Sequence, residues 1–89
     1  VTGVQTCALP IYPFVIDIFP SSEEEVKLST HEGEEFIYVL EGEVEIKYGK
    51  ETYHLKTGDS IYYESIVAHH VHSFGSENAK ILAVVYTPV

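Results

Sequence analysis

The chain has 89 residues, and 14 acidic side chains outnumber 5 basic ones to give a formal net charge of −9. A chain this short forms one domain that buries only about 60% of its unfolded surface, and its negative charge repels nucleic-acid backbones, which excludes nucleic acid as an expected partner. No apolar stretch approaches the roughly 20 residues that span a bilayer, and no basic segment precedes a signal-like run, so a cytoplasmic protein without membrane contact is expected. The only cysteine, Cys7, cannot form an internal disulfide.

Residues 1–11 differ from the rest of the chain because they carry no charge and no clear periodicity. They resemble the conceptual translation of a sequencing-library adapter rather than a natural protein segment. We therefore expect residues 1–11 to be a non-native leader and residues 12–89 to be the domain, with no role for Cys7. On this interpretation the natural protein continues upstream of Tyr12.

From Tyr12 onward, short apolar or alternating runs are separated by turn residues, and no helical period is sustained. Strands are predicted over residues 14–19, 26–30, 36–40, 44–48, 51–55, 60–64, 69–74 and 80–86. Gly49 and Lys50 stand where a two-residue hairpin turn is expected. About eight strands at this spacing predict an all-β fold, either a jelly roll or a small barrel.

Two of these strands, residues 36–40 and 80–86, are apolar on both faces. A two-layer domain of this size cannot cover both faces with its own residues. The sequence therefore predicts a homodimer in which one sheet is covered by the second subunit.

The stretch from His31 to Gly42 is the most informative part of the chain. Glu35 follows His31 by four positions and begins an apolar run, in which it shares a face with Ile37 and Val39. Its carboxylate therefore points where core side chains point. An inward carboxylate needs a cation, a hydrogen-bonding partner or a raised pKa.

These residues resemble the motifs of the cupins, which are small jelly-roll β-barrels. His31 to Gly42 is similar to the first cupin motif, and Gly58-Asp59 leading to His69 is similar to the second. The runs His-Glu-Gly-Glu-Glu-Phe-Ile-Tyr-Val-Leu-Glu-Gly and Leu-Lys-Thr-Gly-Asp-Ser-Ile-Tyr-Tyr look most like the cupin sensor domain that follows the DNA-binding domain of bacterial XRE-type helix-turn-helix regulators. The resemblance covers residues 12–89.

The resemblance implies a metal site formed by His31, Glu35 and His69. The family's first histidine is replaced by Ser29, which is a poor ligand for such a metal. Two histidines and a carboxylate remain adequate for a divalent transition metal such as Zn, Fe, Mn or Ni. The alternative is that His31 and Glu35 only hydrogen-bond to each other and that His69 is a core histidine.

The remaining polar residues receive more modest assignments. Tyr53, Tyr63 and Ser29 are candidates for contact with a small-molecule ligand, since a hydroxyl group can position a bound molecule. His54, His70 and His72 are expected to face water or a partner. No residue is assigned a catalytic role.

Two functions remain open. In the first, the domain is a small-molecule sensor and dimerisation module of a transcriptional regulator, whose DNA-binding domain lies upstream. In the second, it is a stand-alone metal-dependent enzyme of the dioxygenase, isomerase or lyase type that holds its ion with His31, Glu35 and His69. The sequence favours the sensor, because one histidine ligand is missing and no general base accompanies the site.

Overall fold

The structure is a computed structural model that describes residues 11–20 and 30–87. Every regular element in this part of the chain is a strand. The seven strands are β1 (Ile11–Ile18), β2 (Glu34–Glu41), β3 (Glu43–Tyr48), β4 (Glu51–Lys56), β5 (Ser60–Glu64), β6 (His69–Ser73) and β7 (Ala79–Tyr86). The predicted all-β class is confirmed. No helix able to span a membrane occurs in the described ranges.

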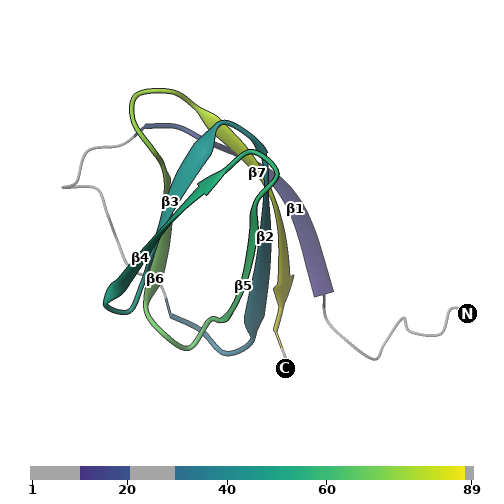
Figure 1. Cartoon of the computed structure of the whole chain (residues 1–89). Coiled ribbons are helices and arrows are strands. Elements are labelled where there is room, and N and C mark those ends of the chain that lie inside the picture. The colour runs from purple at the N-terminus through teal and green to yellow at the C-terminus, as the bar shows by residue number, and fades with distance from the viewer. Residues whose placement is uncertain (1–10, 21–29, 88–89) are drawn as a thin grey trace, which may run out of the picture.

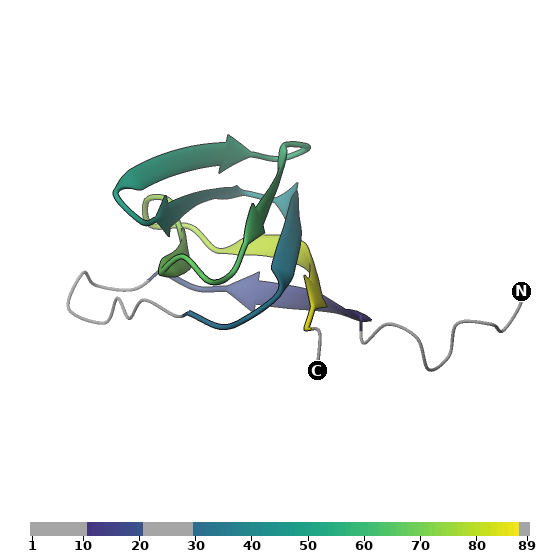
Figure 2. The same ribbon diagram turned by 90° about the horizontal axis from the view of Figure 1, so that it is seen from below.

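The strands form two sheets that face each other (Figure 1). One has four strands in the order β1-β7-β2-β5, and the other has three in the order β4-β3-β6. All pairs between neighbouring strands are antiparallel. Figure 2 shows the two layers from one end, with β1 and β4 at opposite sides of the molecule. This arrangement is consistent with the expected cupin jelly roll.

The predicted strands correspond closely to the observed ones, and the differences lie at their ends. Ile11, the last residue of the expected leader, is the first residue of β1 and pairs with Tyr86. The rest of that leader, and residues 26–29 of the short strand predicted over 26–30, lie outside the described residues. The expected hairpin joins β3 to β4, and Gly49 adopts the positive φ of 59° that such a tight turn requires.

The core lies between the two sheets and follows the alternation predicted from the sequence. Its buried apolar residues are Ile37, Val39, Val44, Ile46, Tyr63, Ala79, Ile81 and Ala83. Because Ile37 and Val39 point inward, Glu35 on the same face of β2 points inward as well. The fold therefore directs a carboxylate toward the interior, as expected.

Gly42 makes the sharp connection between β2 and β3. Its φ is +77°, and a Cβ atom at this position would lie 2.7 Å from the backbone oxygen of Asn78. Only glycine satisfies both conditions without a shift of the backbone. This glycine fixes the end of the motif strand that carries Glu35.

The four-stranded sheet carries an outer apolar face that the described residues leave partly exposed. Its members are neighbours across the strands, namely Pro13, Val15, Phe36, Tyr38, Tyr62, Leu82 and Val84. Val15 and Tyr62 retain 65% and 62% of their accessible surface. The apolar outer side predicted for β2 and β7 is thus present, and the homodimer inferred from it stays a prediction.

Candidate metal centre

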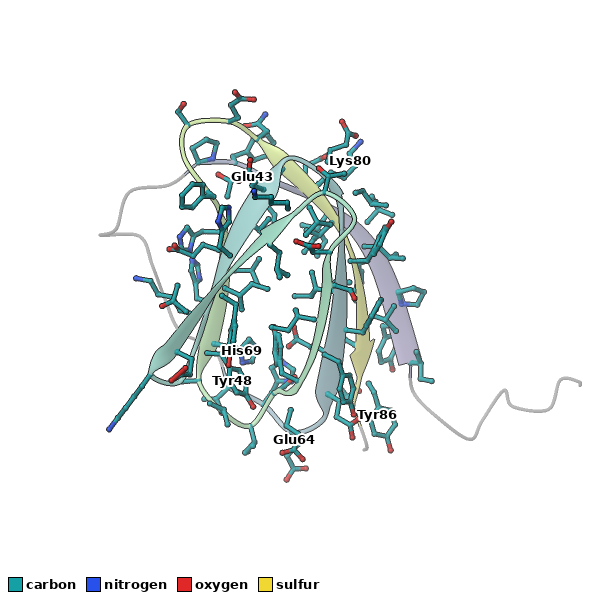
Figure 3. The ribbon with its side chains drawn as sticks, viewed as in Figure 1. Glu43, Tyr48, Glu64, His69, Lys80 and Tyr86 are labelled. Carbon is teal, nitrogen blue, oxygen red and sulfur yellow. The ribbon has the colours of Figure 1, made fainter. Side chains whose placement is uncertain are left out.

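His31, Glu35 and His69 come together at one end of the sandwich. His31 lies just before β2, Glu35 is the second residue of β2, and His69 is the first residue of β6. One potential ligand atom from each lies within 4.8 Å of the others. Figure 3 shows His69 beside Tyr48 at this end, away from Glu43 and Lys80.

The three residues meet across the core, since β2 and β6 belong to opposite sheets. The backbone N–H of His31 donates to the Ser65 carbonyl at 3.0 Å, and the N–H of Ser65 donates to the Gly33 carbonyl at 2.9 Å. These bonds fasten the loop that carries His31 to the end of β5.

Glu35 is the centre of the cluster. Its Oε2 lies 2.8 Å from His31 Nε2 and 3.0 Å from His69 Nε2. The same oxygen accepts a 3.0 Å hydrogen bond from the Ser65 hydroxyl, and Oε1 accepts one of 2.9 Å from the Tyr63 hydroxyl. The side chains of Glu35 and His69 are only 12% and 6% exposed, so this carboxylate depends on protein partners rather than on water.

In both imidazoles, the hydrogen bond made by Nδ1 determines whether Nε2, the nitrogen nearer Glu35, carries a proton or a lone pair. His69 Nδ1 lies 2.8 Å from the Val67 carbonyl, and His31 Nδ1 lies 3.2 Å from the Glu32 carbonyl. Because a carbonyl oxygen only accepts, each Nδ1 carries the proton in these bonds. In a neutral imidazole, Nε2 then directs a lone pair at the carboxylate oxygen of Glu35. Either additional protons or a bound cation must offset the repulsion between these lone pairs and the carboxylate.

A divalent transition metal fits this set of donors. Two ligands at right angles around an ion with bonds of about 2.1 Å lie about 3 Å apart, which matches the separation of Glu35 Oε2 from each Nε2. Two histidines and one carboxylate are the facial set that holds Fe(II) in many oxygenases. A simple hydrogen bond between His31 and Glu35, the alternative considered from the sequence, uses the same contact but leaves the convergence of His69 on that oxygen unexplained.

Tyr63 supports the carboxylate from β5. It pairs with Glu35 across the β2–β5 ladder, so both side chains occupy the same inner face. Burial is the main cause that raises the pKa of Tyr63, and the negative charge of Glu35 and the hydrogen bond to it raise it further. The hydroxyl therefore stays protonated and remains a hydrogen-bond donor to Glu35.

A pocket of about 410 Å³ lies beside this cluster. It is lined by Tyr48, Tyr53, Leu55, Ser60, Ile61, Tyr62 and Tyr63. Both tyrosines singled out as ligand contacts, Tyr53 and Tyr63, line it, and Tyr63 links it to Glu35. The third candidate, Ser29, lies outside the described residues.

Sequence reasoning missed two residues of the site. Ser65, which is fully buried, holds Glu35 Oε2, and Tyr48 packs against Tyr63 with ring centroids 5.1 Å apart. The alternation of β5 could have indicated Ser65, because it follows Tyr63 by two positions. Of the histidines expected to face outward, His54 contacts Glu43 at 2.6 Å and His72 contacts Glu45 at 3.0 Å, both away from the cluster.

Comparison with known proteins agrees with this architecture. The family model of the cupin domain matches residues 15–85. The (S)-2-hydroxypropylphosphonic acid epoxidase of Streptomyces wedmorensis is 36% identical over 81 residues, which cover 83% of this chain and 40% of the epoxidase. The chain thus spans about two fifths of the length of that relative.

Solved structures of HppE are also similar to this chain. The crystal structure of FeII HppE in complex with substrate has a TM-score of 0.75 and 36% identity, covering 84% of this chain and 45% of that one. The corresponding CoII complex has a TM-score of 0.73 and 34% identity, covering 84% and 44%. These relatives bind iron or cobalt and are not named as regulators. They support the enzyme alternative better than the sensor that the sequence favoured.

Proposed function

The chain belongs to the cupin family, and we propose that its domain is the metal-binding part of an enzyme that acts on a small organic molecule. The observation that carries the proposal is the convergence of His31 Nε2 and His69 Nε2 on one oxygen of Glu35. Three protein ligands leave the remaining positions of a divalent ion open to substrate. The iron and cobalt forms of HppE support Fe(II) or Co(II) as the ion.

A bound Fe(II) would supply Lewis-acid polarisation and electron transfer, while the protein supplies position and orientation. Tyr63 and Ser65 fix both oxygens of Glu35 by donating hydrogen bonds. The carbonyls of Val67 and Glu32 hold the two imidazoles with Nε2 directed inward. Partners of this kind orient metal ligands and change metal affinity by about 10-fold to 100-fold when lost.

The pocket beside the cluster is where we place the substrate. Tyr63 contacts both, so a molecule bound in the pocket lies next to the metal donors. The pocket and the donors open onto the same end of the sandwich, where Tyr48 pairs with His69. This arrangement supports the assignment of Tyr53 and Tyr63 as ligand contacts.

The sensor of a transcriptional regulator is the second candidate. It is favoured by the absence of a free general base, because the pocket residues in the described part of the chain include no carboxylate or histidine. A sensor would bind its ligand, with or without metal, and leave it unchanged. We also propose that the outer apolar face of the four-stranded sheet joins two copies of the chain, since soluble monomers seldom expose a contiguous apolar face.

The test measures oxygen consumption with a panel of small organic molecules after the full chain has been loaded with Fe(II) without oxygen. We expect substrate-dependent oxygen uptake by the wild type and none by His69→Ala. His54→Ala is the matched control, because His54 also contacts a glutamate but lies outside the cluster. Ligand binding without oxygen uptake or product would favour the sensor instead.

A further inference from the structure

The pocket beside Glu35 is lined by aromatic, aliphatic and hydroxyl-bearing residues. It lies between β3, β4 and β5. Five of its seven lining residues have side chains on the inner face, namely Tyr48, Tyr53, Leu55, Ile61 and Tyr63, whereas Ser60 and Tyr62 pair with Tyr38 and Phe36 and direct their side chains to the outer face. None of these side chains carries a charge at neutral pH. The apolar carbons of Leu55 and Ile61 and the faces of the tyrosine rings provide most of what a ligand would touch.

No positively charged side chain occurs among the described residues that line the pocket. The chain contains no arginine, and none of the lysines in residues 11–20 and 30–87 lines the pocket. Lys80, for example, lies near Asp17 and Glu41, at 3.9 and 3.4 Å. Anionic groups such as phosphonates are held in proteins by Arg, Lys or clusters of N–H donors.

Most hydroxyl protons of the pocket are already committed to the protein. Tyr63 donates to Glu35 at 2.9 Å, and Tyr48 donates to the Glu64 carbonyl at 3.1 Å. A tyrosine hydroxyl has a single proton, so these two oxygens can only accept from a ligand. Among the described residues, Tyr53 keeps the only inward lining hydroxyl that does not donate to a protein acceptor.

We propose that this pocket takes an uncharged or cationic organic molecule that donates hydrogen bonds, and that it excludes phosphonates and carboxylates. In the metal-free pocket an anion would meet hydroxyl oxygens and the charge of Glu35, and no lining side chain would supply a compensating cation, which is costly in a partly buried site. A hydroxyl or ammonium group would instead donate to those oxygens, and an ammonium group would also be attracted to the tyrosine faces. The inference rests on the proposed function for its substrate, and it departs from the phosphonic acid named for the relative.

The experiment compares four ligands that share one ring, namely benzyl alcohol, benzylamine, benzoate and benzylphosphonate. Their affinities for the full chain are measured by ligand-detected NMR titration, both metal-free and loaded with Co(II). We expect the alcohol and the amine to bind at least about tenfold more tightly than either anion in the metal-free form. The metal-free form separates the pocket's preference from direct binding of an anion to the ion.

Two variants place the same new charge inside and outside the pocket. Tyr53→Arg adds a cation on the inner face of β4, where Tyr53 lines the pocket opposite the buried Ile46, and should improve binding of benzylphosphonate by at least about tenfold. Thr52→Arg adds it to an exposed position of β4 that does not line the pocket, and it should leave all four affinities unchanged. Circular dichroism confirms that both variants are folded.

The proposal is overturned if either anion binds the metal-free wild type as tightly as the alcohol or the amine, or if neither of these two binds. It is also overturned if Tyr53→Arg does not improve binding of benzylphosphonate in a folded protein. Metal content is measured on the same samples. A chain that binds no Co(II) but keeps the ligand preference would contradict the proposed enzyme function and not the character of the pocket.

Discussion

Tyr63 on β5 donates a hydrogen bond of 2.9 Å to Glu35 on β2, directly across the ladder that joins the two strands. This contact connects the pocket to the cluster of His31, Glu35 and His69. It leaves Oε2 of Glu35 as the oxygen that both imidazoles approach. The orientation of the carboxylate, and with it the proposed metal site, therefore depends on a residue that is not itself a proposed ligand.

The first prediction removes this hydroxyl. Tyr63→Phe should weaken the affinity for Fe(II) or Co(II) by about tenfold, because loss of a partner that orients a metal ligand typically costs 10-fold to 100-fold. Titration of the metal-free chain under anaerobic conditions measures the affinity. Tyr53→Phe is the control, since Tyr53 lines the same pocket without contacting Glu35. Equal affinities for the wild type and Tyr63→Phe would contradict the role given to this hydroxyl.

The second prediction concerns alkaline pH. Burial and the neighbouring Glu35 raise the pKa of Tyr63 in the native state, so the native chain holds this proton more tightly than the unfolded chain does. The stabilisation is complete below the ordinary tyrosine pKa of about 10 and is lost as pH rises above it. Urea unfolding at several alkaline pH values should show stability falling with pH more steeply for the wild type than for Tyr63→Phe. Parallel curves for the two proteins would exclude this linkage.

Much of the site could be predicted from alternation along single strands. Period two placed Glu35 with Ile37 and Val39, and it placed His69 with the buried Ser73, as the structure has them. The contacts that complete the site could not be predicted in this way. Ser65 and Tyr63 lie 30 and 28 positions from Glu35, and their meeting depends on which strands pair and on side-chain rotamers. The convergence of His31 and His69 from opposite sheets likewise depends on the tertiary fold.

The third prediction concerns the proposed leader. Deletion of residues 1–10 should leave the melting temperature unchanged within about two degrees, as expected for a segment that was not selected to pack against the domain. Ile11 is kept, because it pairs with Tyr86 in β1. Differential scanning calorimetry of the two chains makes the comparison. A fall of about ten degrees would correspond to a loss of more than about 1 kcal/mol and would show that the segment belongs to the fold.

The fourth prediction concerns the outer apolar face. We expect a dimer by sedimentation at micromolar concentration, with an interface that is the same patch on both subunits. Phe36→Lys should give a monomer, because it places a charge at the middle of that face, opposite Tyr62 and Val84. Thr52→Lys, on the other sheet, is the control. A monomeric wild type would leave the exposed apolar face without the partner proposed for it.

The central claim is that His31, Glu35 and His69 together hold one divalent metal ion. The most direct measurement is the iron content per chain after anaerobic loading with Fe(II) and removal of excess metal, compared between the wild type and Glu35→Gln. The account predicts close to one iron per wild-type chain, and almost none in Glu35→Gln, because the amide has no negative charge to balance the ion. The wild-type chain should also lose iron as the pH is lowered from about 7.5 to about 5.5, since protonated imidazole cannot ligate a metal ion. Equal iron content in the wild type and the folded Glu35→Gln variant would contradict the claim.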